Sequence, residues 1–255
     1  MIIVREVLNM KYKYKKEHII TYSEADKNLK LSLYSSMQLA QDIMTKYFQT
    51  FGSDNNTIMK NDNAVWVLSK AKIHFNKYPN WLENIKCHSY TTVYKMVRVQ
   101  IETIFLDQDD EILFIVMQEC CPIDIKTRKP RKINTISYPK DMEITEAVLK
   151  EDFSRFTSKF KEENLAYNQK VQALDIDFSD HTNNVSYVKY LINTFSSDYW
   201  SNKIITDFEI HYINESRENE KLDIYKIEQD NCKIEFLIKN NDKEVAKARI
   251  SYKQK

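Results

Sequence analysis

The chain of 255 residues contains a single glycine, Gly52. Walker A phosphate loops, dinucleotide-binding fingerprints and the Gly-x-Ser-x-Gly nucleophile elbow each require at least two glycines at fixed spacing. The sequence therefore excludes these three kinds of site. Any hydrolytic activity has to use a different arrangement of residues.

Cysteine and long apolar runs are also scarce. The four cysteines, at positions 87, 120, 121 and 232, include no Cys-x-x-Cys pair, so we expect neither a zinc site nor a disulfide framework. No apolar run reaches the roughly 18 residues that a membrane-spanning helix needs. Residues 1–14 lack the apolar core and cleavage site of a signal peptide, so we expect a cytoplasmic protein.

An excess of charge of either sign is absent as well. The 38 basic and 37 acidic residues give a net charge of +1, which creates no general attraction for nucleic acid. One local basic cluster consists of Lys126, Arg128, Lys129, Arg131 and Lys132. It is either a solvated charged surface or a docking site for an acidic partner.

Hydrophobic periodicity divides the chain into two halves with the same order of elements. The first half predicts a strand at 12–22, a helix at 31–51, a polar loop at 54–63, and strands at 65–78, 85–97, 99–107 and 112–125. The second half predicts a strand at 166–175, a helix at 185–195, and strands at 204–212, 221–229, 232–239 and 244–252. Between the halves, the charged stretch 143–163 predicts a helix in a linker.

The predicted helix at 31–51 carries an apolar stripe that includes Met37 and ends at Gly52, a residue typical of helix C-termini. Such a stripe is either ordinary core or one wall of a channel for an apolar ligand. Met37 and Trp66, on the following strand, are therefore candidate substrate-binding residues.

The densest polar cluster of the chain is Asp175-Ile-Asp-Phe-Ser-Asp-His-Thr-Asn-Asn184, directly before the second predicted helix. Side-chain oxygens at such a position cap the first helical N–H groups, and a capping role alone would explain most of the cluster. A calcium loop is excluded, because the EF-hand pattern requires Gly at its sixth position and Glu at its twelfth. This chain has Asp180 and Ser186 there.

The pattern Asp-x-Asp-x-x-x-His-x-Asn-Asn-x-x-Tyr, from Asp175 to Tyr187, resembles the active-site signature of hot-dog thioesterases. The whole chain resembles the acyl-acyl carrier protein thioesterase family, because further runs follow in the family's order. These runs are Ala64-Val-Trp-Val-Leu-Ser-Lys70, Tyr78-Pro-Asn-Trp81, Phe105-Leu-Asp107 and Pro122-Ile-Asp-Ile-Lys-Thr-Arg-Lys-Pro130.

The resemblance implies an α+β fold of two tandem hot-dog domains, each an antiparallel sheet wrapped around a central helix. The expected domains are 1–125, which shapes the acyl pocket, and 166–255, which carries the reaction. Residues 126–165 are the expected basic, partly helical linker. The turn at 23–28 lacks His and the Asn pair, so we expect one active site per chain.

The resemblance also implies the site residues. The catalytic candidates are Asp177, Ser179, His181 and Glu215, with Ser179 standing where the family has Asn. Ser216 stands where many members have Cys, so water activated by carboxylates is the expected nucleophile. Asn183 and Asn184 are expected to fix the loop and contact substrate.

The implied activity is hydrolysis of fatty acyl-acyl carrier protein to free fatty acid, which ends chain elongation. The implied partner is the carrier with its phosphopantetheine-linked acyl chain, docked on Arg128, Lys129, Arg131 and Lys132. Neither a metal nor an organic cofactor is expected, and a homodimer is left open. Two alternatives remain: an acyl-coenzyme A thioesterase of the same fold, and a non-catalytic acyl-thioester-binding regulator, which the Ser at position 179 favours.

Overall fold

The computed structural model describes residues 11–255, so predictions for the first ten residues lie outside it. The chain divides into two compact units, Met1–Glu151 and Asp152–Lys255. The domain limits expected from the sequence, 1–125 and 166–255, stay predictions. No helix among residues 11–255 is long and apolar enough to cross a bilayer.

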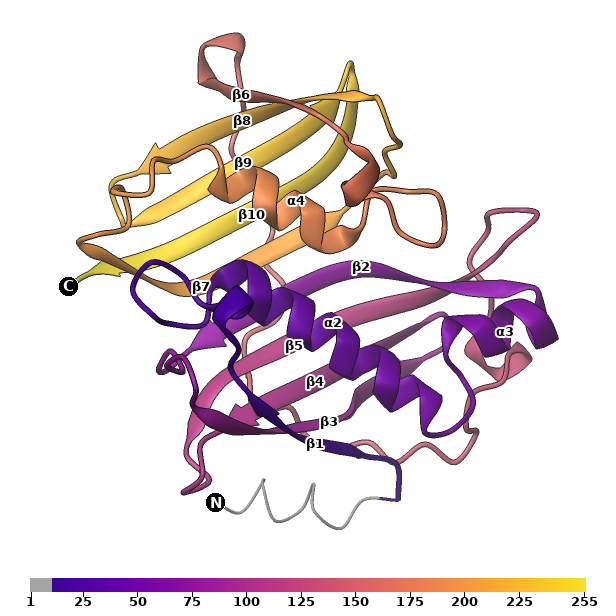
Figure 1. Ribbon diagram of the computed structural model, residues 1–255. Coiled ribbons are helices and arrows are strands. Elements are labelled where there is room, and N and C mark those ends of the chain that lie inside the picture. The colour runs from indigo at the N-terminus through magenta and orange to yellow at the C-terminus, as the bar shows by residue number, and fades with distance from the viewer. Residues whose placement is uncertain (1–10) are drawn as a thin grey trace. The chain divides into compact units, whose positions relative to one another are not determined.

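Unit 1 is an antiparallel sheet with one long helix across it, labelled α2 in Figure 1. Its strands are β1 (Tyr14–Ile19), β2 (Ala64–Phe75), β3 (Asn84–Lys95), β4 (Arg98–Leu106) and β5 (Ile112–Asp124). They follow the order β1-β3-β4-β5-β2, and every neighbouring pair is antiparallel. All the strands predicted for the first half are confirmed to within a few residues.

Helix α2 (Leu33–Gln49) is confirmed as the central helix of unit 1. The Ser32 side chain caps it by accepting the N–H of Ser35 at 3.0 Å. Its apolar face is buried against β3 and β4, with Met37 only 2% exposed. Gly52, three residues past its end, has a φ of 68°, which a glycine adopts without strain.

The predicted loop at 54–63 is wrong, because these residues form helix α3 (Asn55–Asp62). Asp54 starts the helix by accepting the N–H of Thr57 at 3.2 Å, and Asn63 ends it with a φ of 52°. Only Ile58 is fully buried, so the helix depends on its two polar ends more than on an apolar stripe. Such a short helix gives periodicity almost no signal.

Unit 2 has the same architecture with a shorter helix, α4 (Asn184–Ile192), lying across its sheet (Figure 1). Its strands are β6 (Leu165–Lys170), β7 (Lys203–Tyr212), β8 (Lys221–Gln229), β9 (Lys233–Asn240) and β10 (Lys243–Gln254). Their order is β7-β10-β9-β8-β6, again with antiparallel neighbours. The expected α+β hot-dog arrangement is thus present in each unit.

The helix predicted at 143–163 is wrong: the segment is extended, and only Glu162–Asn164 forms a 3-10 turn. Its backbone N–H groups bond to buried glutamates instead of to helical carbonyls. Glu102 on β4 accepts the N–H groups of Val148 at 2.8 Å and Leu149 at 2.9 Å. Charge patterning indicated a helix because it cannot reveal such distant acceptors.

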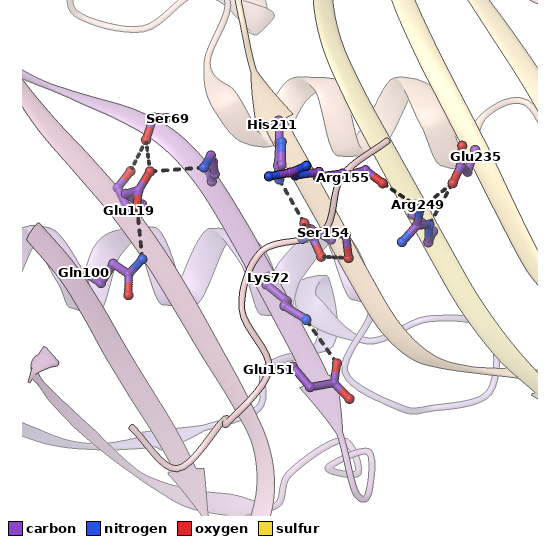
Figure 2. Close-up of polar contacts among 12 residues, drawn as sticks. Ser69, Lys72, Gln100, Glu119, Glu151, Ser154, Arg155, His211, Glu235 and Arg249 are labelled. Atoms are coloured by element: carbon purple, nitrogen blue, oxygen red, sulfur yellow. Dashed lines mark hydrogen bonds and ion pairs between the residues drawn. The ribbon is translucent and has the colours of Figure 1, made fainter. Parts of the chain in front are cut away.

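Contacts along the same segment are drawn in Figure 2. In unit 1, Lys72 Nζ lies 3.1 Å from the Glu151 carboxylate. In unit 2, the Ser154 N–H donates to Glu209 Oε1 at 2.6 Å, and His211 Nε2 lies 2.8 Å from the same oxygen. The segment is therefore fastened to each unit separately by a charged or polar anchor.

The two units repeat a loop bond for bond between their first strand and their helix. In unit 1 the N–H of Asp26 donates to Lys30 O at 2.7 Å, and that of Ser32 donates to Glu24 O at 3.0 Å. The same two bonds recur 151 residues later, from Asp177 to His181 O at 2.9 Å and from Asn183 to Asp175 O at 2.7 Å. The two loops therefore have the same main-chain hydrogen bonds, and we call this shared pattern the loop frame.

Candidate active site

Helix α4 begins where the sequence predicted a cap. Asn183 is the N-cap residue, and its Oδ1 accepts the N–H of Val185 at 3.0 Å. Asp175 fastens the loop to the helix, because its buried carboxylate pairs with Lys189 one turn from the end of α4. Burial raises the pKa of Asp175, but the Lys189 ammonium and the N–H of Gln172 outweigh it and leave the pKa below 3.8.

Within this loop, three predicted residues form a row of hydrogen bonds. Asp177 Oδ1 accepts the Ser179 N–H at 2.9 Å and the Ser179 hydroxyl at 2.6 Å. The Ser179 oxygen in turn lies 3.2 Å from His181 Nδ1. Because Ser179 gives its only hydroxyl proton to the carboxylate, His181 Nδ1 must be the donor in the second bond.

The row continues onto the segment that follows β7. His181 Nε2 lies 2.9 Å from Glu215 Oε2, so the structure brings together all four predicted catalytic residues. The His181 side chain is 14% exposed and that of Glu215 is 42% exposed. A water molecule can therefore reach the carboxylate, while the imidazole is held largely inside the protein.

Arg217 is a member of this cluster that the sequence reasoning missed. Its Nη2 lies 3.3 Å from His181 Nε2, and its Nη1 lies 3.4 Å from Asp180 Oδ2. The residue lies two positions after Glu215 on a turn, where no periodic pattern marks it. Its nearness to Glu215 in sequence was the only available signal.

Ser216, beside the candidate base, is 1% exposed and turned into the protein. Its hydroxyl lies 2.7 Å from Thr182 Oγ1 and 2.8 Å from the Tyr187 hydroxyl. Its carbonyl accepts the N–H of Thr182 at 2.8 Å. These contacts make Ser216 a structural link between the turn and the loop before α4, and they argue against a nucleophilic role.

The other predicted substrate contacts lie in different places. Asn184 is the first residue of α4, and its carbonyl accepts the Tyr212 hydroxyl at 3.3 Å. In unit 1, Met37 is buried on α2, and Trp66 is buried on β2, stacked on Phe48 at a centroid distance of 4.9 Å. Their contribution to an acyl pocket stays a prediction.

The basic cluster lies at and just after the hairpin tip that follows β5. Asp124 Oδ1 shapes the tip by accepting the N–H groups of Lys126 and Thr127, at 3.0 and 2.8 Å. Arg128, Lys129 and Lys132 are exposed there. Arg131 is half-buried instead, and its guanidinium donates to the carbonyls of Asp62 and Thr135.

The matching loop of unit 1 carries different side chains on the same frame. Asp26 and Asn28 stand where unit 2 has Asp177 and Ser179, and Lys30 stands in place of His181. The bond from Leu31 N to Pro79 O, at 2.9 Å, corresponds to the bond from Thr182 N to Ser216 O in unit 2. Tyr78 is therefore the residue of unit 1 that corresponds to Glu215. Neither the imidazole nor the second carboxylate is present at these positions.

Comparison with known proteins assigns the two units separately. The acyl-ACP thioesterase N-terminal domain matches residues 11–137, and the acyl-ACP thioesterase C-terminal domain matches residues 157–254. A search of curated proteins finds no match.

Two solved structures share the fold over nearly the whole chain. An acyl-ACP thioesterase from Bacteroides thetaiotaomicron is 19% identical, with a TM-score of 0.87 over 95% of this chain and 98% of that one. The 12:0-ACP thioesterase from Umbellularia californica is 17% identical, with a TM-score of 0.83 over 96% of this chain and 99% of that one. With both of its units matched in order, the chain belongs to the acyl-ACP thioesterase family.

Proposed function

We propose that this protein hydrolyses the thioester of fatty acyl-acyl carrier protein, and that the row from Asp177 to Glu215 carries the reaction. Family membership supports the reaction class. The observation that supports the site is the unbroken chain of contacts from the Asp177 carboxylate through Ser179 and His181 to Glu215.

In this mechanism Glu215 is the general base. Its carboxylate takes a proton from water as the water oxygen bonds to the acyl carbon. The tetrahedral intermediate then collapses, the carbon–sulfur bond breaks, and the leaving thiolate takes up the proton. The products are a fatty acid and the free phosphopantetheine thiol, so one water molecule is consumed and no redox step occurs.

Asp177 has a positioning role in the same mechanism. It accepts two hydrogen bonds from Ser179, so its Oδ1 is engaged in fixing the loop rather than in attacking the substrate. Ser179 is thereby held as the acceptor for His181 Nδ1, which orients the ring toward Glu215. The N-terminal end of α4 adds the positive end of its dipole, which favours the negative oxygen of the intermediate.

The carrier is the partner that the exposed basic residues fit best. Arg128, Lys129 and Lys132 can attract an acidic surface, and such steering raises association rates more than it raises affinity. Arg131 fits this role less well, because backbone carbonyls already receive its guanidinium. A cytoplasmic location and a homodimer stay predictions.

The test is a release assay with a thiol reagent on acyl-carrier protein and on the matching acyl-coenzyme A. We expect release from the carrier substrate, and changing Arg128, Lys129 and Lys132 together to Glu should raise KM for that substrate alone. Equal effects on both substrates would remove the docking role. Faster release from acyl-coenzyme A would favour an acyl-coenzyme A thioesterase. Tight acyl-thioester binding without release would favour a non-catalytic regulatory protein.

A further inference from the structure

We propose that Gln118 of unit 1 binds a hydroxyl group on the acyl chain, so that the protein prefers hydroxyacyl substrates. This preference rests on the proposed function, because it names the class of acyl chain that the same reaction takes. The residue that carries it is buried in unit 1 and has no part in the proposed mechanism.

Gln118 lies on β5 and faces helix α2. Cys120, two residues further along the strand, contacts Met44 of α2, with 3.4 Å between the two sulfur atoms. Side chains two residues apart on a strand point to the same face of the sheet. Gln118 therefore points to the face that α2 covers, and the residue is only 1% exposed.

The amide group of Gln118 is unpartnered. Among residues 11–255, neither its Oε1 nor its Nε2 has a hydrogen-bond partner. An amide that leaves water without gaining hydrogen bonds destabilises the folded protein, and such groups are rare in protein interiors. A ligand group that both donates and accepts would satisfy the two atoms at once.

Helix α2 and strand β5 run in the same direction. Met44 contacts Cys120, and one helical turn later Phe48 stacks on Trp66, the β2 residue that pairs with Pro122 of β5. One helical turn covers about 5.4 Å and two strand residues cover about 6.6 Å, so helix and strand advance almost in step.

The side chains beside Gln118 are small on two sides. Its paired residue on β2 is Ala71. On α2, Ala40 stands one turn before Met44 and therefore comes level with Gln118. Both alanines are fully buried. A methyl group covers far less of a neighbouring amide than a long apolar side chain does, so a ligand needs to displace little to reach Gln118.

The equivalent place in unit 2 can be located from a bond that both units make. The N–H groups of Asn76 and Ile213 donate to the carbonyls of Leu113 and Val245, both at 2.9 Å. Each bond lies where the first long strand of its unit ends beside the last one. Counting away from these bonds along the paired strands therefore identifies equivalent residues.

Unit 2 fills this place with large apolar side chains. The pair Ala71–Gln118 of unit 1 corresponds to the pair Phe208–Ile250 of unit 2. Phe208 and Ile250 are fully buried and bring no polar side-chain atom. The architecture therefore does not require a glutamine here, and the amide beside two alanines indicates a ligand instead.

The surroundings favour an apolar chain that carries one hydroxyl group. The face of α2 that is buried in unit 1 includes Met37, Ile43 and Met44, which suit an alkyl chain. A hydroxyl group can donate to Gln118 Oε1 and accept from Nε2, whereas a keto oxygen can only accept and a saturated chain can do neither. The proposed reaction supplies such a ligand as the acyl chain of its substrate.

Binding of free fatty acids tests the preference without catalysis. The probes are dodecanoic and hexadecanoic acid, each with a series of derivatives in which a single hydroxyl group is moved along the chain. In calorimetric titrations we expect one hydroxyl position to give binding about tenfold tighter than the parent acid, the scale of a pair of neutral hydrogen bonds in a buried site. Equal, weaker or absent binding of every hydroxylated acid would overturn the proposal and leave Gln118 to a buried water.

Gln118→Met removes the amide and keeps the length of the side chain. It should abolish the tenfold preference and raise the urea midpoint of the free protein, because no unpartnered amide remains buried. Gln38→Met makes the same change on the exposed side of α2 and should alter neither quantity. A preference that persists in Gln118→Met, or a lowered urea midpoint, would assign the amide a purely structural role.

The hydroxyl preference and the proposed function can fail separately. A wild-type protein that prefers hydroxylated acids, yet releases no thiol from any acyl-carrier protein, would overturn the proposed function alone. A wild-type protein that hydrolyses saturated and hydroxyacyl carrier substrates with equal kcat/KM, and binds both kinds of acid alike, would overturn the hydroxyl preference alone.

Discussion

Leu82 of unit 1 and Asn219 of unit 2 occupy equivalent positions, in the segments 78–83 and 215–220, and have φ values of 65° and 69°. Each donates its N–H to the residue after the first strand, Leu82 to Ile20 O and Asn219 to Val171 O, both at 3.0 Å. Asn tolerates this left-handed conformation far better than Leu. The chain therefore stores strain in unit 1 that it avoids in unit 2.

Exchanging these two residues should move stability in opposite directions. Leu82→Asn should raise the free energy of unfolding by roughly 0.5–1 kcal/mol, because the side chain is 65% exposed and little burial is lost. Asn219→Leu should lower it by a similar amount. Urea denaturation measures both changes, and a loss of stability in Leu82→Asn would show that the leucine contributes packing that outweighs its strain.

Removing the proposed base should abolish most of the rate without changing the fold. Glu215→Gln keeps the size and loses the charge, so kcat should fall on the order of 10²-fold or more. Asp177→Asn should cause a comparable loss through Ser179 and His181. Stopped assays on acyl-carrier protein, with circular dichroism as a folding control, measure this. Near-normal turnover in Glu215→Gln would mean that another residue activates the water.

Ser216→Ala separates a structural from a nucleophilic serine. The buried hydroxyl links Thr182 and Tyr187, so its loss should lower the free energy of unfolding by about 1–2 kcal/mol. The value of kcat at a temperature well below the unfolding transition should change little. An inactive but fully folded variant would assign the nucleophile to Ser216 and contradict the water mechanism.

Ser179→Asn should keep or raise activity, and unit 1 supplies the reason. Asn28 fits the matching place in the repeated loop, where its N–H and its Nδ2 donate to the Asp26 carboxylate at 2.8 and 3.2 Å. An amide at position 179 can thus preserve the bond to Asp177. Comparison of kcat for the variant and the wild type tests this, and a fall of tenfold or more would show that the hydroxyl is required.

Glu102 should make the stability of unit 1 depend on pH. Its pKa lies above 4.5, chiefly because it is fully buried, although the N–H groups of Val148 and Leu149 and the Tyr90 hydroxyl oppose the shift. The folded state then binds this proton more tightly than the unfolded state. The resulting stability is present in full below pH 4.5 and is lost as pH rises through the raised pKa.

Glu102→Gln cannot ionise and should lack this dependence. The wild type should therefore lose stability relative to the variant as pH rises from 4 to 8. Denaturant midpoints across this range measure the difference. A difference that stays constant over the range would show that the Glu102 carboxylate keeps one protonation state throughout.

The sequence predicted the parts of the fold that rest on periodicity. Helix α2 and the strands β2 to β5 follow their apolar spacing, since burial of one face decides their form. Helix α3 was missed because its stability comes from capping by Asp54 and Asn63. The extended linker was missed because its partner, Glu102, lies 46 residues before Val148.

The proposed catalytic residues could be named from the sequence, but their arrangement in space could not. The family resemblance identified Asp177, His181 and Glu215 as candidates. Which of them contact one another depends on how the segment after β7 packs against the loop before α4. Arg217 escaped for the same reason, since only the folded turn brings it to His181. Three-dimensional proximity between segments some 35 residues apart leaves no trace in local spacing.

The two loops share their main-chain hydrogen bonds and an aspartate that accepts the N–H two residues further on, Asp26 in unit 1 and Asp177 in unit 2. The loop therefore keeps its form although its other side chains differ. The same loop geometry thus presents two different sets of side chains. Lys30 and Tyr78 of unit 1 occupy the positions that correspond to His181 and Glu215 of unit 2. Two substitutions, at Lys30 and Tyr78, would place an imidazole and a carboxylate in the unit 1 loop without removing any of its main-chain hydrogen bonds.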